Sequence, residues 1–209
     1  MKRILYFLPA VMISISGYSQ SYHKKALEYY YMGCDMMEKN NYQVAVNDFA
    51  EAISIDPLFK EAYENRGVAR FRLNDIRGAI EDYNEALEMD PNDFSTYGRR
   101  GWAKYVIRDY PGAIEDLTMA VQGAKYLDKY YNMRGEARYQ LRDYEGAIAD
   151  FSRVTKSFAA IRSEKATAYF WRAMSLIELG QKDNACSDLH MAARKGYMKA
   201  YEVLRVICE

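Results

Sequence analysis

The sequence predicts an all-α fold, a solenoid of about five helix pairs that ends in a capping helix. Half of the 209 residues are apolar and only four are proline, and such a composition favours helix. Glycines recur at intervals of 34 residues, at Gly33, Gly67, Gly101 and Gly135. Within each interval, apolar residues follow the three- and four-residue spacing of amphipathic helices rather than the alternation of strands. A period of this length indicates a repeat architecture.

Residues 1–19 differ from the rest of the chain and are predicted to be an export signal. The basic pair Lys2-Arg3 is followed by a mostly apolar stretch and then by small residues. This order is typical of a cleavable signal peptide, with cleavage expected near Ser19-Gln20. The apolar stretch contains a proline and is too short to span a bilayer comfortably. We therefore expect a periplasmic or secreted protein without a membrane span.

Other residues repeat in register with the glycines. An aromatic residue stands four positions before each glycine, and an alanine stands twelve positions after it. A fifth unit follows a four-residue insertion and carries Ala173 in place of the glycine. From Ala26 to about Gly196 the chain resembles the tetratricopeptide repeat (TPR) family, which implies a right-handed superhelical solenoid. The expected segments are a short extension at 20–25, repeats at 26–59, 60–93, 94–127, 128–161 and 162–196, and a capping helix at 197–209.

Each predicted pair is a helical hairpin with recurring polar residues. An Asn or Asp in the turn is expected to cap the second helix, at Asn41, Asp75, Asp109 and Asp143. The small residue on the first helix and the large residue opposite it are expected to let the helices approach closely. Arginines repeat on the first helices (Arg66, Arg100, Arg134, Arg172) and aspartates on the second (Asp48, Asp82, Asp116, Asp150, Asp188). We hypothesise a ladder of ion pairs between helices, in which one arrangement joins each Asp to the Arg of the following unit.

Two of the cysteines predict a disulfide that links the capping helix to the last helix pair. Cys186 and Cys208 lie symmetrically about the turn expected near Gly196, so antiparallel helices would bring them level. Disulfides are common in exported proteins, and we expect this one; two buried thiols are the alternative. Cys34, next to Gly33, is expected to be a small packing residue.

Several function classes find no support in the sequence. Removing residues 1–19 takes two basic residues from a balanced total, which leaves a net charge of about −2 and no basic face for nucleic acid. The two histidines, His23 and His190, belong to no spaced metal or catalytic set. We therefore expect no enzyme activity, no cofactor and no metal.

The resemblance implies a binding surface, because first helices of this family line a concave groove that receives a peptide or partner helix. Candidate contact residues should vary between units. Those that vary are Tyr30, Glu64, Arg72, Trp102, Asn132, Glu136 and Phe170. Further candidates are Phe71, Tyr105 and Tyr139, which belong to a recurrent series of large apolar residues whose alternative role is packing between neighbouring first helices. Helical spacing places Trp102 and Tyr105 on one face as an aromatic anchor.

The predicted function is a non-enzymatic interaction scaffold of the cell envelope that binds a protein or peptide. The alternative is a carbohydrate-binding module for cell-wall glycan that uses the same aromatics. Repeats that hold acidic chaperone tails carry Lys and Asn where this chain has Tyr30 and Cys34, so that activity is not expected. Self-association through an apolar N-terminal face remains open.

Overall fold

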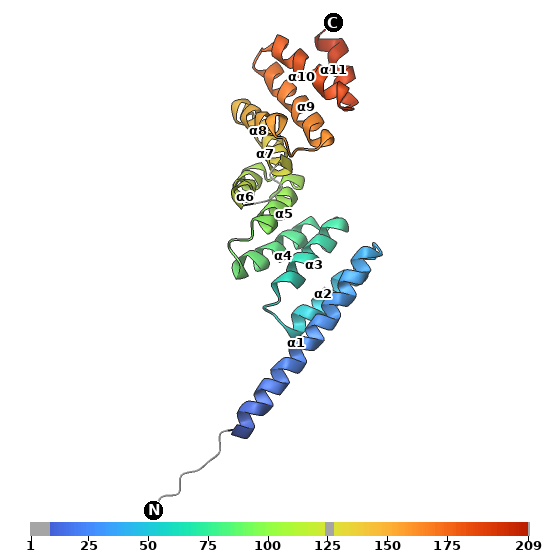
Figure 1. Cartoon of the computed structure of the whole chain (residues 1–209), viewed down its shortest axis with the longest axis vertical. Helices are drawn as coiled ribbons and strands as arrows, with labels where there is room; N and C mark the ends of the chain where they lie inside the picture. The colour runs from blue at the N-terminus through green and yellow to red at the C-terminus, as the bar shows by residue number, and fades with distance from the viewer. Residues whose placement is uncertain (1–8, 124–127, 209) are drawn as a thin grey trace, which may run out of the picture. The chain divides into compact units, whose positions relative to one another are not determined.

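The computed structural model describes residues 9–123 and 128–208, and the side chains from residue 23 onward (Figure 1). Every regular element among these residues is a helix. They are α1 Pro9–Glu38, α2 Tyr42–Ile55, α3 Lys60–Arg72, α4 Ile76–Met89, α5 Phe94–Val106, α6 Tyr110–Gly123, α7 Asp128–Gln140, α8 Tyr144–Lys156, α9 Arg162–Glu178, α10 Lys182–Arg194 and α11 Lys199–Ile207. The start of the expected export signal, residues 1–8, lies outside the described residues.

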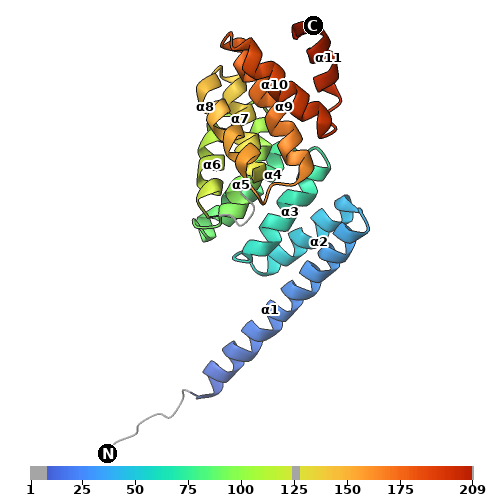
Figure 2. The same cartoon turned by 45° about the horizontal axis from the view of Figure 1, so that its top comes forward.

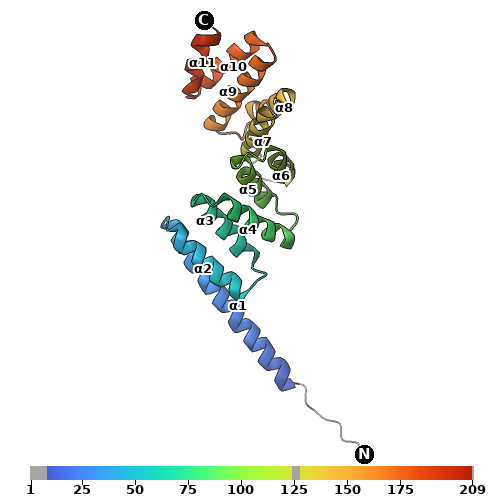
Figure 3. The same ribbon diagram turned by 180° about the vertical axis from the view of Figure 1, so that it is seen from behind.

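The helices form two compact units, residues 1–91 and 92–209. In the first unit α1 packs on α2, α3 packs on α4, and α2 also contacts α3. Helix α1 is about twice as long as α2, and its N-terminal half extends past its partner, as Figures 1 and 3 show. Residues 20–25 therefore continue α1, and α1 also runs through the expected cleavage point.

In the second unit three helix pairs are stacked in sequence order. Each first helix, α5, α7 or α9, packs on its own second helix, α6, α8 or α10, and each second helix contacts the next first helix. The first helices also contact each other, α5 with α7 and α7 with α9, and they form one layer in Figure 2. Residues that vary on these three helices are therefore brought side by side.

The recurring glycines allow the two helices of a pair to approach closely. A Cβ built on Gly33 would lie 2.6 Å from the Phe49 ring, and one on Gly135 would lie 2.8 Å from the Phe151 ring. At Gly101 the partner is Leu117, whose Cγ would be 2.9 Å away. Each large partner is fully buried. The predicted packing of a small residue against a large one is confirmed.

The turns inside three of the five described helix pairs share one cap, whereas Asn41 and Gln181 make no side-chain cap. Asp75, Asp109 and Asp143 accept a hydrogen bond from the backbone N–H three residues later, at 3.0–3.1 Å. In each case that residue is a glycine, and a Cβ there would collide with the capping carboxylate. Asn41 makes no side-chain cap, because Val44 occupies the place of the glycine. The predicted cap is therefore wrong for Asn41 and confirmed for the three aspartates.

The ion-pair ladder exists, but its pairs lie inside each repeat. Arg66 bonds Asp82, Arg100 bonds Asp116, Arg134 bonds Asp150 and Arg172 bonds Asp188, with closest N–O distances of 2.7 Å. These aspartates are at least 94% buried. The arrangement that joined each Asp to the following unit is wrong, because the helical hairpin places residues 16 apart opposite each other. Each arginine also lies over the ring of the tyrosine three residues before it. The repeated tyrosines therefore act as cation–π partners of the repeated arginines.

The first repeat lacks its arginine. Met32 stands 16 residues before Asp48, where the other repeats carry Arg, and Met32 is 53% exposed. The Oδ2 atom of Asp48 is buried and accepts no hydrogen bond from a described residue. Burial raises the pKa of Asp48 above its ordinary value. A carboxyl whose pKa is raised on folding destabilises the fold when it is ionised, so the first repeat carries an uncompensated charge at neutral pH.

The Met32→Arg substitution is expected to stabilise the protein by about 1 kcal/mol at neutral pH, because it supplies the missing partner of Asp48. Chemical denaturation of the variant and the parent measures the difference. Met32→Gln controls for helix propensity and polarity and should give no such gain. In an Asp48→Asn background the gain from Arg should disappear; an equal gain there would show that Asp48 is not its source.

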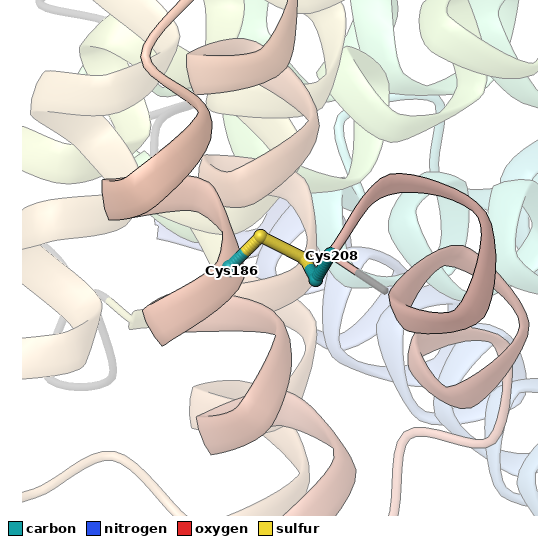
Figure 4. The surroundings of a disulfide bond; sticks show 2 residues. All are labelled: Cys186 and Cys208. Atoms are coloured by element: carbon teal, nitrogen blue, oxygen red, sulfur yellow. A yellow bond between two sulfur atoms is a disulfide. The ribbon is translucent and has the colours of Figure 1, made fainter.

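Helix α11 covers the end of the last pair. Ala200 and Leu204 are buried in a cluster with Phe170, Leu176 and Leu189. Tyr201 on the same helix is 48% exposed, and its hydroxyl donates to the Ala193 carbonyl. Cys186 of α10 and Cys208 after α11 form a disulfide with a Cα–Cα distance of 5.8 Å (Figure 4). The cap is therefore held by apolar packing and by a covalent link.

Candidate functional site

The aromatic pair Trp102 and Tyr105 lies on α5. Their rings are stacked, with centroids 5.1 Å apart and planes within 10° of parallel. Tyr105 also meets Tyr110 of α6 edge-on, at 5.5 Å between centroids. Both rings keep part of their surface exposed. The one-turn spacing that predicted a shared face thus gives a direct stack, which fixes both side chains as a rigid platform.

Glu136 on the neighbouring helix α7 extends this platform. The Tyr105 hydroxyl donates to Glu136 Oε2 over 3.5 Å. Burial raises the pKa of Glu136 to about 7, and the hydrogen bond from Tyr105 only partly opposes this effect. Burial and the charge of Glu136 together raise the pKa of Tyr105 to about 12. We call Trp102, Tyr105 and Glu136 the aromatic surface.

Tyr197 lies in the turn between α10 and α11. Burial raises the pKa of Tyr197, and the negative charge of Glu136 raises it further. Tyr197 stacks on Phe170 of α9 with ring centroids 4.5 Å apart. The sequence did not single out Tyr197, because it follows Gly196 outside the repeat and no periodic comparison reaches it.

Two of the candidate contact residues in this unit are buried. Phe170 is 6% exposed and belongs to the core under α11. Asn132 is also 6% exposed, and its amide donates to the Glu164 carbonyl of α9 over 3.0 Å. Both side chains make their contacts within the protein, and neither belongs to the candidate surface. Comparing repeats reveals which positions vary, but it does not reveal burial.

Tyr139 of α7 is half-buried in a separate group of rings. It packs against Trp171 of α9 at 5.1 Å and against Tyr144 of α8 at 5.5 Å. Burial raises its pKa, with a smaller contribution from Glu178. Trp171 was not predicted as a candidate from the sequence, because it lies between two positions that recur in the repeats. This group ties α7, α8 and α9 together.

The candidates in the first unit make mostly internal contacts. Tyr30 packs on Phe59 at 4.8 Å and its hydroxyl accepts from Asn65, and burial, followed by Cys34, raises its pKa to about 12. Glu64 pairs with Lys60 at 3.2 Å. Arg72 lies over the Tyr42 ring at 4.8 Å, and Phe71 is partly exposed one residue before it. Cys34 is a partly buried free thiol.

Neither a metal site nor a membrane-spanning helix is found among the described residues. Within residues 9–123 and 128–208, no three His, Cys, Asp or Glu side chains gather as a metal site would require. No helix in the same ranges combines the length and apolar character needed to cross a membrane. The exposed apolar residues of α1 include Tyr31 and Met32, at 65% and 53% exposure.

Comparison with known proteins identifies the repeat. Two family models, both described as tetratricopeptide repeat, match residues 61–93 and 132–195. No curated protein sequence matches the chain. Among solved structures, YrrB, a TPR protein with an unusual peptide-binding site, is 16% identical to this chain with a TM-score of 0.77, and the match covers 94% of this chain and 98% of YrrB.

Two further solved structures show the same fold. MamA from Desulfovibrio magneticus RS-1 is 18% identical with a TM-score of 0.76, over 82% of this chain and 94% of its own. The first TPR of Spaghetti (RPAP3), bound to the HSP90 peptide SRMEEVD, is 23% identical with a TM-score of 0.55, over 56% of this chain and 94% of its own. At these identities the likeness concerns the fold alone.

Proposed function

The chain is a tetratricopeptide repeat protein, and we propose that it is a scaffold that binds a peptide or partner helix on the first helices of residues 92–209. The aromatic surface carries this proposal. Trp102 and Tyr105 form a partly exposed, rigid stack, and Glu136 beside them belongs to none of the repeated ion pairs. Aromatic anchors of this kind dominate the energetics of many interfaces. Trp102 and Glu136 share a repeat position whose residue varies from unit to unit, whereas Tyr105 belongs to a position that carries a large apolar residue in every unit.

The structural neighbours support a peptide as the ligand class. YrrB is described as having a peptide-binding site, and the RPAP3 domain holds a peptide. Binding on neighbouring first helices needs no chemistry from the chain itself. The scaffold therefore acts by holding its partner.

The test is affinity capture with the full chain as bait, compared with its Trp102→Ala variant, together with a glycan array. A protein retained by the parent and lost from Trp102→Ala supports the proposal. Phe158→Ala is the matched control, because Phe158 is fully exposed between α8 and α9 and should leave capture unchanged. Retention of a glycan on the array, with no protein captured, would instead support the carbohydrate-binding alternative.

We also propose that the scaffold works outside the cytoplasm, in the periplasm or after secretion. The basic start, the apolar stretch and the small residues before Gln20 support this location. Cell fractionation followed by N-terminal sequencing tests it. A mature chain that begins at Gln20 is expected in the envelope or the medium, and a cytoplasmic chain that retains Met1 would contradict the proposal.

A further inference from the structure

Glu136 differs from the other buried carboxylates of its unit. Asp116, Asp150 and Asp188 each bond an arginine, and none of the described Lys, Arg or His side chains pairs with Glu136. Its one hydrogen-bond donor is the neutral Tyr105 hydroxyl. At the equivalent position of the other repeats stand Cys34, Val68, Trp102 and Met174, so no repeated packing role explains a carboxylate here.

An aromatic stack lies beside Glu136. Tyr105 lies toward α5 and is backed by Trp102. Tyr197, whose pKa the charge of Glu136 also raises, stacks on Phe170. A carboxylate beside an aromatic stack suits a cation, because the carboxylate supplies a charge-assisted bond and aromatic rings attract positive charge. Glu136 is itself partly exposed, so a ligand can reach it.

We propose that Glu136, with Tyr105, is a subsite for one positively charged side chain, lysine or arginine, of the bound peptide. This inference rests on the proposed function, since it names the chemistry of a ligand on the same surface. A peptide that carries an apolar or aromatic residue beside the basic one would place that residue on Trp102. The partner is thus a basic-apolar segment rather than an acidic one.

The subsite should respond to pH near neutrality. Among described residues, Tyr105 and Tyr197 are the titratable groups that interact with Glu136, and both stay neutral because their pKa values are raised. The pKa of Glu136, about 7 in the free protein, should fall when a cation binds. Cation binding therefore releases a proton, and affinity should weaken as the pH falls below about 7.

A random-peptide display library, selected against the full chain and its Glu136→Gln variant, tests the subsite. Gln keeps the size of the side chain and an acceptor for the Tyr105 hydroxyl but removes the charge. Glu145→Gln is the control, because Glu145 is exposed on α8. The parent and the control should enrich peptides with Lys or Arg at one fixed position, and Glu136→Gln should lose this preference.

Calorimetry with one enriched peptide then measures the size of the effect. Glu136→Gln should weaken binding by about tenfold or more, as should replacing the basic residue of the peptide by Met. The parent should also bind more weakly at about pH 6 than at about pH 8, whereas Glu136→Gln should lose this dependence.

The outcomes separate the two proposals. Equal enrichment of peptides by the parent and Glu136→Gln, without a basic preference, would overturn the cation subsite and leave peptide binding intact. Failure to enrich any peptide would overturn both.

Discussion

Replacing Arg172 by Leu is expected to lower the free energy of unfolding by about 3–5 kcal/mol, because it leaves a buried carboxylate without its partner. Both oxygens of Asp188 accept from Arg172, each at 2.7 Å, and Asp188 is 6% exposed. The same guanidinium donates to the hydroxyls of Ser152 and Thr155 on α8. Arg172 thus joins α9 to both of the second helices that flank it.

Chemical denaturation checks this result against two other variants. Arg205→Leu on α11 removes an exposed arginine and should change stability by less than about 0.5 kcal/mol. The double variant Arg172→Leu with Asp188→Leu removes both charges and should recover much of the loss. If Arg172→Leu were as stable as the parent, the ladder would have no stabilising role.

Loss of the Cys186–Cys208 disulfide is expected to cost about 2–4 kcal/mol, because the bond closes a loop across a sequence separation of 22 residues. The variant Cys186→Ala with Cys208→Ala should unfold at a lower denaturant concentration than the parent. Reductant should reproduce this loss in the parent and have no effect on the variant. Cys34→Ala, which removes the free thiol, should keep the response to reductant.

Intact mass tests the bond itself. Reduction of the full chain should add two hydrogen atoms, and alkylation without reductant should label Cys34 alone. Labelling of all three cysteines without reductant would show that Cys186 and Cys208 are thiols in the isolated protein.

The period of the sequence was sufficient to predict the scaffold. It located the helices, the close contact at Gly101 and the residues of the ladder, because these features depend on spacing along a regular hairpin. It missed how the ladder is connected, since the pairing of Arg66 with Asp82 depends on which residues the hairpin places opposite each other. The absent cap at Asn41 follows from one local change, the valine at position 44.

The candidate site was predicted less completely. The stack of Trp102 on Tyr105 followed from helical spacing, which one helix determines by itself. The burial of Phe170 depends instead on α11, and its stack with Tyr197 depends on the turn that precedes α11. Both are contacts between segments that do not repeat, so comparison of repeats carries no information about them.

The central claim is that a partner binds across Trp102. A photoreactive phenylalanine analogue at position 102 of the full chain, activated in the native cells, tests it directly when mass spectrometry identifies the adduct. The account predicts a discrete protein adduct at position 102 and none when the analogue replaces Tyr201 on α11. No protein adduct at position 102, or the same adducts at both positions, would contradict it.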